Sequence, residues 1–120
     1  GLLSALCGCV VKAGLGSAAG LAYMLDAPID AAIRNMAGNI TGEICDGAKV
    51  GCAVKICTAA GAAVESALLA RAGVEIPQTN GILAALPRHV FENIGEIARS
   101  MRAVDRTIVQ IMERKEEAAL

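Results

Sequence analysis

The sequence predicts an all-α fold, a single compact helical domain of about five helices with two long, buried central helices rich in alanine and glycine. Hydrophobic residues make up 55% of the chain but aromatic residues only 2%, so aliphatic side chains and methionine must fill the core. Thirteen glycines allow helices to approach one another closely. A β-sandwich would instead need many aromatic and β-branched residues. At 120 residues the chain is long enough to bury one core.

The first two helices are predicted from an apolar run and a turn. The run near residues 3 to 25 carries only one charge, that of Lys12, and forms the first helix. In the following DAPID, Asp26 is suited to cap a second helix and Pro28 to occupy its first turn. This second helix runs to about Gly38, where the glycine- and asparagine-rich stretch GNITGEICDG predicts a loop.

Three more helices follow this loop. The third runs from about Asp46 to Ala72 and ends at Gly73, a suitable C′ glycine. After the linker VEIPQTNG, a fourth begins at Pro87 and a fifth follows Ser100. The apolar residues of these last two helices fall at helical spacing with charges between them, which predicts an amphipathic wrapping. They are Val90, Ile94, Ile97, Met101, Val104, Ile108 and Ile111.

The distribution of charge argues against nucleic acid and against a membrane as partners. The net charge of −1 gives no indication of nucleic-acid binding.

The apolar first helix contains GSAAG, a G-x-x-x-G motif, and so leaves a membrane-spanning hairpin as an alternative. Lys12 lies in the middle of that stretch, and its flanks lack a basic or aromatic belt. Lys49, Lys55 and Glu65 make the third helix a poor span. We therefore expect a buried central helix and no membrane.

Five cysteines are the candidate functional residues: Cys7, Cys9, Cys45, Cys52 and Cys57. Their odd number and the lack of a secretory signal argue against a disulfide framework and favour a reducing, cytoplasmic compartment. No pair has C-x-x-C spacing. Two interpretations stay open at this point, a metal site and simple packing, since free cysteine is among the most frequently buried residues.

The position of Cys45 favours a metal site. It lies where the predicted loop turns into the third helix, and free N–H groups there would stabilise a thiolate. On one helix, Cys45 and Cys52 would be about 10 Å apart, too far for a single tetrahedral ion. A cluster is compatible only if Cys45 lies on the loop and folds back. Cys7 and Cys9 cannot both face one site, because residues i and i+2 point in different directions.

Several stretches resemble one family. CGC followed by an Ala/Gly-rich helix, then NMAGNITGEICDGAKVGCAVKI, and finally RSMRAVDRTIVQIM are similar to the C-terminal part of the L-cysteine desulfidase family. That family is related to the alpha domain of iron–sulfur L-serine dehydratases. The resemblance covers nearly the whole chain, and ICDGAK…C is its most specific piece. It implies a lyase in which a [4Fe-4S] cluster on three cysteines leaves one iron open to an amino-acid substrate.

The resemblance also implies roles for individual residues. It implies cluster ligands at Cys9, Cys45 and Cys52, with Cys7 as the alternate, while Cys57 is expected in the core. Lys49 and Lys55 are candidates to hold a substrate carboxylate or are solvated helix charges. The catalytic base is unassigned: His89, the only histidine, is expected on the surface, and Asp46 is expected to cap a helix.

The chain begins at Gly1 with an apolar run, and we expect residues 1–120 to be the C-terminal domain of a longer protein. The fragment is then inactive alone, and an N-terminal domain of the same chain completes the site. The expected ligands are a small amino acid and a [4Fe-4S] cluster; homo-oligomerisation is left open. The competing class is a non-catalytic relative that uses its cysteines only for packing.

Overall fold

The computed structural model describes residues 5–47 and 49–119. One π-helical turn, η1 (Gly8–Lys12), leads directly into α1 (Ala13–Met24). The other helices are α2 (Ile29–Ile40), α3 (Val50–Arg71), α4 (Pro87–Ser100) and α5 (Arg102–Ala119). Within these described residues there is no strand, only an isolated antiparallel bridge between Leu6 and Ile44. The all-α prediction is confirmed.

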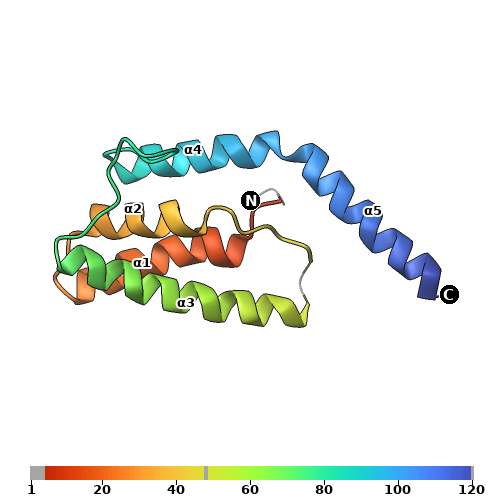
Figure 1. The fold of residues 1–120 in the computed structure, drawn as a ribbon, viewed down its shortest axis with the longest axis horizontal. Coiled ribbons are helices and arrows are strands. Elements are labelled where there is room, and N and C mark those ends of the chain that lie inside the picture. The colour runs from red at the N-terminus through yellow and green to blue at the C-terminus, as the bar shows by residue number, and fades with distance from the viewer. Residues whose placement is uncertain (1–4, 48, 120) are drawn as a thin grey trace.

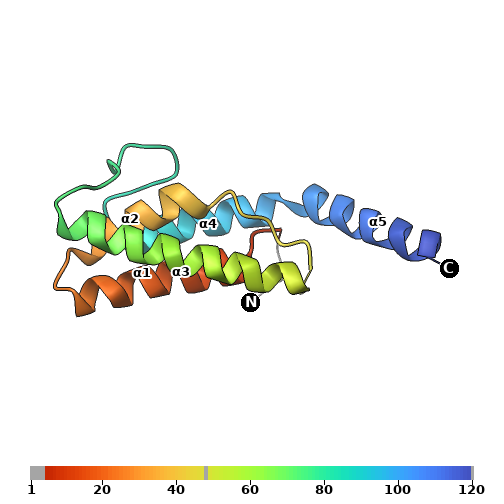
Figure 2. The ribbon, with the colours of Figure 1, turned by 60° about the horizontal axis from the view of Figure 1, so that its bottom comes forward.

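Three helices form the centre of the fold. α1, α2 and α3 lie side by side and all three pack on one another, whereas α4 packs on α2 (Figure 1). α5 continues from α4 at an angle and extends away from the other helices (Figure 2). The molecule is therefore elongated, with extents of 54 × 26 × 21 Å.

Small side chains allow the three central helices to pack closely. At Gly14 of α1, a Cβ atom would lie only 2.7 Å from Cε of the fully buried Met36 of α2. Glycine at this point therefore lets Met36 lie against the α1 backbone. Most other buried contacts are made by alanine, as the composition predicts. These alanines include Ala18, Ala22, Ala32, Ala37, Ala63 and Ala67, all 0% exposed.

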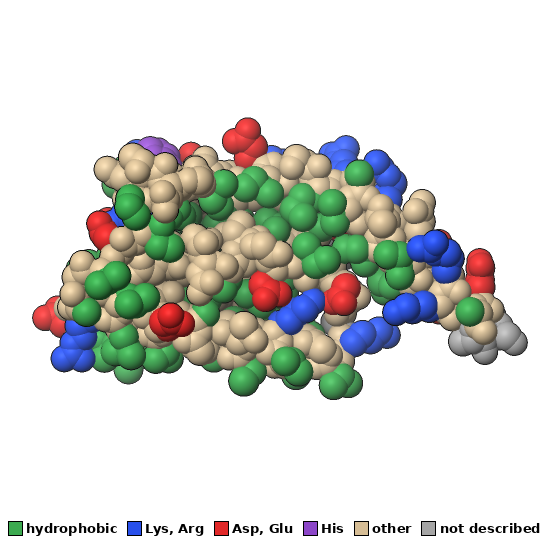
Figure 3. All heavy atoms as spheres, viewed as in Figure 1, with side chains coloured by type: hydrophobic (Ala, Val, Ile, Leu, Met, Phe, Trp, Pro, Cys, Tyr) green, Lys and Arg blue, Asp and Glu red, His purple; other side chains and the backbone are tan. Residues whose placement is uncertain are grey.

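α3 buries one face and exposes the other. Its alanine-rich face packs on α1 and α2, but Val50 is 86% and Val54 64% exposed on the opposite side. Figure 3 shows apolar side chains along this edge of the molecule. In the described part of the chain, α3 is the helix long and apolar enough to cross a membrane, so the prediction that its composition makes it a poor span is wrong. Core helices of soluble proteins can pass the same test, but only 22% of this apolar stretch is buried. Lys55 and Glu65 lie within it.

Two predicted helix starts are wrong. The helix predicted from residue 3 begins at Gly8, because Leu6 is extended and pairs with Ile44. Its residues 3 and 4 lie outside the described part. The helix predicted from Asp46 begins at Val50 with Lys49 as its N-cap, so Cys45 belongs to the preceding loop. Asp46 consequently caps no helix.

The turns around the second and third helices are partly as predicted. Asp26 has a positive φ of 54°, and Pro28 rather than Asp26 is the N-cap of α2. Gly73 has φ 79° and follows the C-cap of α3, as predicted. The N–H of Val74 donates to the carbonyl of Leu69, and that of Gly73 to Ala70, which is the Schellman arrangement.

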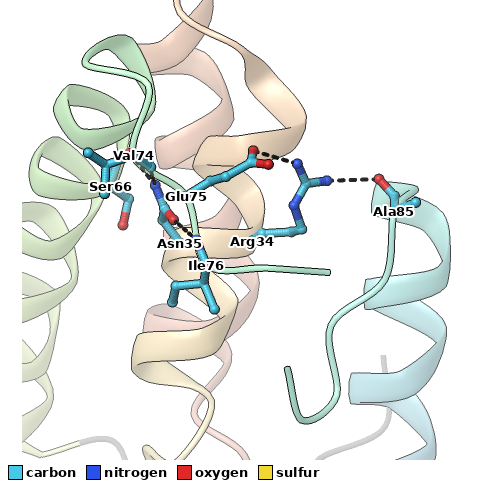
Figure 4. Close-up of polar contacts among 7 residues, drawn as sticks. All are labelled: Arg34, Asn35, Ser66, Val74, Glu75, Ile76 and Ala85. Atoms are coloured by element: carbon cyan, nitrogen blue, oxygen red, sulfur yellow. Dashed lines mark hydrogen bonds and ion pairs between the residues drawn. The ribbon is translucent and has the colours of Figure 1, made fainter. Parts of the chain in front are cut away.

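Two neighbouring residues of α2 hold the long connection between α3 and α4 (Figure 4). The buried amide of Asn35 donates to the carbonyls of Ser66 and Val74 and accepts from the N–H of Ile76 at 2.8 Å. The guanidinium of Arg34 donates to Glu75 at 2.7 Å and to the carbonyl of Ala85 at 2.9 Å. The connection is thus tied to the helix core by polar contacts at both of its ends.

We expect Asn35→Ala to lower the free energy of unfolding by about 2–4 kcal/mol, because it removes three hydrogen bonds and leaves buried backbone groups unpaired. Urea unfolding followed by helical circular dichroism measures this change. The matched control is Asn39→Ala, one turn later on α2 at an exposed position, where the change should stay within about 0.5 kcal/mol. Equal losses for the two variants would contradict the anchoring role of Asn35.

Candidate functional site

The backbone bridge between Leu6 and Ile44 brings the CGC segment next to the loop that carries Cys45. The N–H of Cys7 donates to the carbonyl of Glu43 at 3.0 Å, and the N–H of Cys45 donates to the carbonyl of Ala5 at 2.6 Å. These two bonds hold the segment that precedes α1 beside the segment that follows α2. The cysteine-bearing segments therefore meet at one end of the three-helix layer.

Two of the predicted ligands are in contact. The Sγ atoms of Cys9 and Cys52 lie 3.9 Å apart, Cys9 exposed on η1 and Cys52 half-buried in the first turn of α3. The hydrogen bond to Cys9 raises the pKa of the Cys52 thiol, and desolvation and the charges of Cys9 and Cys45 raise it further. We expected Cys45 to lie at a helix N-terminus, and in the structure Cys52 lies there instead.

Cys7 and Cys57 lie elsewhere. Cys7 is 3% exposed within the hydrophobic core, while Cys9, two residues on, is exposed. The expected divergence of Cys7 and Cys9 is therefore observed, with Cys9 beside a second thiol. Cys57 is exposed on α3 rather than packed in the core as expected, because the face of α3 that carries it has no neighbouring helix.

Cys45 is half-buried on the loop and packs at the edge of the hydrophobic core. It lies near enough to Cys52 and Lys55 for the charge of its thiolate to raise the pKa of both groups. Among residues 5–47 and 49–119, however, no three Cys, His, Asp or Glu side chains converge as a metal-binding group. The structure brings Cys9 and Cys52 into contact and leaves Cys45 beside the pair.

Lys55 fastens the loop to α3. Its ammonium donates to Asp46 Oδ1 at 2.7 Å and to the carbonyl of Ile44 at 2.9 Å. The hydrogen bond to Lys55 and the lysine charge hold the pKa of Asp46 below its usual range, with a smaller contribution from the charge of Lys115 on α5. The same hydrogen bond raises the pKa of Lys55. Both residues flanking Cys45 are thereby held by one side chain.

Other residues complete the surroundings. Lys49 is exposed at the start of α3, and His89 is exposed on α4, as expected. Sequence reasoning missed the approach of α5 to the loop, where Met112 Cε lies 3.5 Å from the position that a Cβ of Gly47 would take. The amphipathic wrapping predicted for α5 is wrong: none of its described side chains is buried, and Val104, Val109 and Ile111 are exposed, because α5 extends away from the other helices.

Comparison with known proteins decides the family. Residues 1–110 match the family model described as the serine dehydratase alpha chain. This chain belongs to the serine dehydratase alpha chain family. The match confirms the resemblance on which the cysteine assignments depend, and it covers all five cysteines and both lysines of the candidate site.

The curated relatives of this serine dehydratase alpha-type chain are longer proteins. It is 45% identical over 119 residues to a UPF0597 protein of Desulfotalea psychrophila and 47% identical over 120 residues to one of Alkaliphilus oremlandii. It is also 46% identical over 114 residues to a UPF0597 protein of Shewanella pealeana. These matches cover 92–97% of the chain but only 26–28% of the relatives. No solved structure matches the chain.

The contact between Cys9 and Cys52 predicts which disulfide forms on oxidation. In metal-free protein, an organic thiol oxidant such as diamide should link these two cysteines first, since a small rotation brings their sulfurs from 3.9 Å to bonding distance. Peptide mass spectrometry after alkylation identifies the pair, and exposed Cys57 should remain alkylated as an internal control. A first disulfide that contains Cys45 or Cys57 would contradict this arrangement.

The ion pair beside Cys45 predicts a titration change. Asp46 should titrate below the usual range for aspartate, so the stability it contributes is present at neutral pH and is lost as the pH falls through that lowered pKa. Lys55→Met should raise the pKa of Asp46 towards its ordinary value, as followed by NMR of the carboxyl carbon. Lys12→Met serves as the control and should leave it unchanged. An unaltered Asp46 titration in Lys55→Met would show that the pair does not form in solution.

Proposed function

We propose that this chain is the cluster-bearing helical domain of an iron–sulfur-dependent amino-acid lyase. The observation that carries the proposal is the pair of thiols at 3.9 Å, one of them exposed, in a member of the serine dehydratase alpha chain family. Thiols that serve only to fill a core have no reason to meet at the surface. The buried Cys7 shows what such a packing cysteine looks like in this fold.

The proposed ligands are Cys9, Cys45 and Cys52, with Cys7 as the less suitable alternate because its side chain lies in the core. Cys9 and Cys52 supply two adjacent sulfurs, which suits a shared metal group, whereas Cys45 must move with its loop to join them. Metal binding requires thiolates and therefore releases the protons of the Cys9–Cys52 pair. The free N–H groups in the first turn of α3 favour negative charge at Cys52 and so oppose the rise in the pKa of its thiol that the contact with Cys9 causes.

A bound [4Fe-4S] cluster with one open iron would supply Lewis-acid chemistry for an α,β-elimination. We assign the residues of this chain to holding the cluster and the substrate in place. Lys55 is engaged with Asp46 and Ile44, so we assign it to ordering the Cys45 loop. Lys49 is exposed one turn from Cys52 and is the better candidate to hold a substrate carboxylate.

The proposed reaction converts L-cysteine and water to pyruvate, ammonia and sulfide, or L-serine to pyruvate and ammonia. Because the chain spans about 27% of its curated relatives, the remaining polypeptide is proposed to complete the active site and to supply the base. From its resemblance to the C-terminal part of the L-cysteine desulfidase family, we propose that residues 1–120 are a C-terminal domain, inactive alone, of a cytoplasmic enzyme.

Anaerobic reconstitution of the full-length protein with iron and sulfide tests the proposal. We expect cluster absorbance together with pyruvate formation from cysteine or serine, and we expect Cys9→Ser and Cys52→Ser to abolish both signals. Cys45→Ser should do the same if the loop folds back to provide the third ligand. A protein that takes up no iron, or whose cluster survives both Cys9→Ser and Cys52→Ser, would refute the assignment.

The matched control is Cys57→Ser, the same substitution at an exposed position on the helix that carries Cys52. It should leave iron content, activity and the free energy of unfolding within error of the unmodified protein. Equal loss of cluster in all cysteine variants would indicate a general folding defect and not ligation. Helical circular dichroism distinguishes these outcomes.

A further inference from the structure

A cavity of about 560 Å³ lies between the start of the chain and the C-terminal helices. Its floor is aliphatic: Val11 and Leu15 come from η1 and α1, and Ile94 comes from α4. The small residues Gly95 and Ala98 of α4 leave the space between these helices unfilled. Figure 3 shows apolar side chains gathered below α4. The volume is that of a typical small-molecule site.

The mouth of this cavity is positively charged. Lys12, Arg99 and Arg102 line it together with a single carboxylate, that of Asp105. In the described part of the chain none of the four side chains forms an ion pair, since the two pairs present join Arg34 to Glu75 and Lys55 to Asp46. The cationic side chains are therefore available to a ligand.

The position of Arg99 links the charge to the apolar floor. Its Nη1 atom lies 3.3 Å from the position that a Cβ of Gly95 would occupy, so the guanidinium folds back along α4 beside the cavity. Glycine at position 95 leaves room for this arrangement. A guanidinium recognises a carboxylate through two parallel hydrogen bonds.

The residues that line the cavity also limit the chemistry of the uncharged part of the ligand. Besides the four charged side chains and Cys7, the described lining is apolar, with Leu6 and Phe91 completing it. Among residues 5–47 and 49–119 no Ser, Thr, Asn, Gln, Tyr or His lines the cavity. Only the charged side chains at the mouth can therefore hydrogen-bond a ligand, and the rest of this lining offers apolar contact. The ligand that fits this lining has a hydrocarbon chain and an anionic head group.

We propose that this cavity, here called the α4 pocket, binds a small carboxylic acid with an aliphatic body, of the medium-chain fatty-acid class. The carboxylate is held by Arg99 and Arg102 at the mouth, and the chain lies against Val11, Leu15 and Ile94. Lys12 adds positive charge from the opposite wall, and Asp105 opposes it in part. The site uses none of the residues Cys9, Cys45 and Cys52, so its existence does not depend on the proposed lyase activity.

Isothermal titration calorimetry of the full-length protein with octanoate tests this site. We expect saturable binding at one site per chain, and binding weaker by about threefold to fourfold for each methylene removed in heptanoate and hexanoate. Octanol, which has the same chain without the charge, should bind at least about tenfold more weakly. Absence of saturable octanoate binding would overturn the proposal. This includes the case in which another segment of the longer polypeptide occupies the pocket.

Two variants locate the site. The double variant Arg99→Gln, Arg102→Gln should weaken octanoate at least about tenfold while leaving octanol unchanged, because only the charged head loses its partners. Ala98→Phe should fill the floor and weaken both ligands. Arg71→Gln, at an exposed arginine of α3 outside the lining, is the matched control. Octanoate affinity unchanged by the double variant, or lowered equally by Arg71→Gln, would refute binding in the α4 pocket.

Discussion

Close packing of α1, α2 and α3, in which Gly14 and buried alanines make room for a few larger side chains such as Met36, is the constraint on which the rest of the structure depends. Gly14 accepts Met36 against its backbone, and alanines fill most of the remaining contacts. Because interiors are packed at near-crystalline density, such an interface tolerates few larger residues. The ends of the three helices are thereby fixed relative to one another, and the cysteine-bearing segments extend from those ends. The geometry of the candidate site therefore depends on alanines distant from it.

Local sequence patterns were sufficient for the fold class, the order of the helices and the Gly73 turn. They failed at the starts of the first and third predicted helices. Leu6 pairs with Ile44 of the loop instead of joining the first helix, and the third helix begins at Val50 instead of Asp46. Leu6 and Ile44 carry no local signal for their pairing, since they are far apart in the sequence. The composition likewise identified the cysteines but not which of them meet. The contact between Cys9 and Cys52 depends on the length and packing angle of α1 and α3, which no spacing rule contains.

The start of α3 also affects where the thiols lie. A helix that began at Asp46 would have put Cys45 and Cys52 on one helix, too far apart to share an ion. Instead Asp46 pairs with Lys55 and the helix begins at Val50. This start leaves Cys45 on a loop beside the Cys9–Cys52 pair, and Lys55 contacts both residues that flank Cys45.

The bridge between Leu6 and Ile44 has a consequence for the order of assembly. The segment that contains Leu6 and Cys9 precedes α1, and Ile44, with which Leu6 pairs, is made only after α1 and α2. Cys52 follows later still, and closing such long loops costs conformational entropy that helix packing must already have offset. The thiols consequently lie far apart in the nascent chain and come together in the folded one. The contact between these two thiols, which are 43 residues apart in the chain, therefore depends on long-range packing and on no local motif.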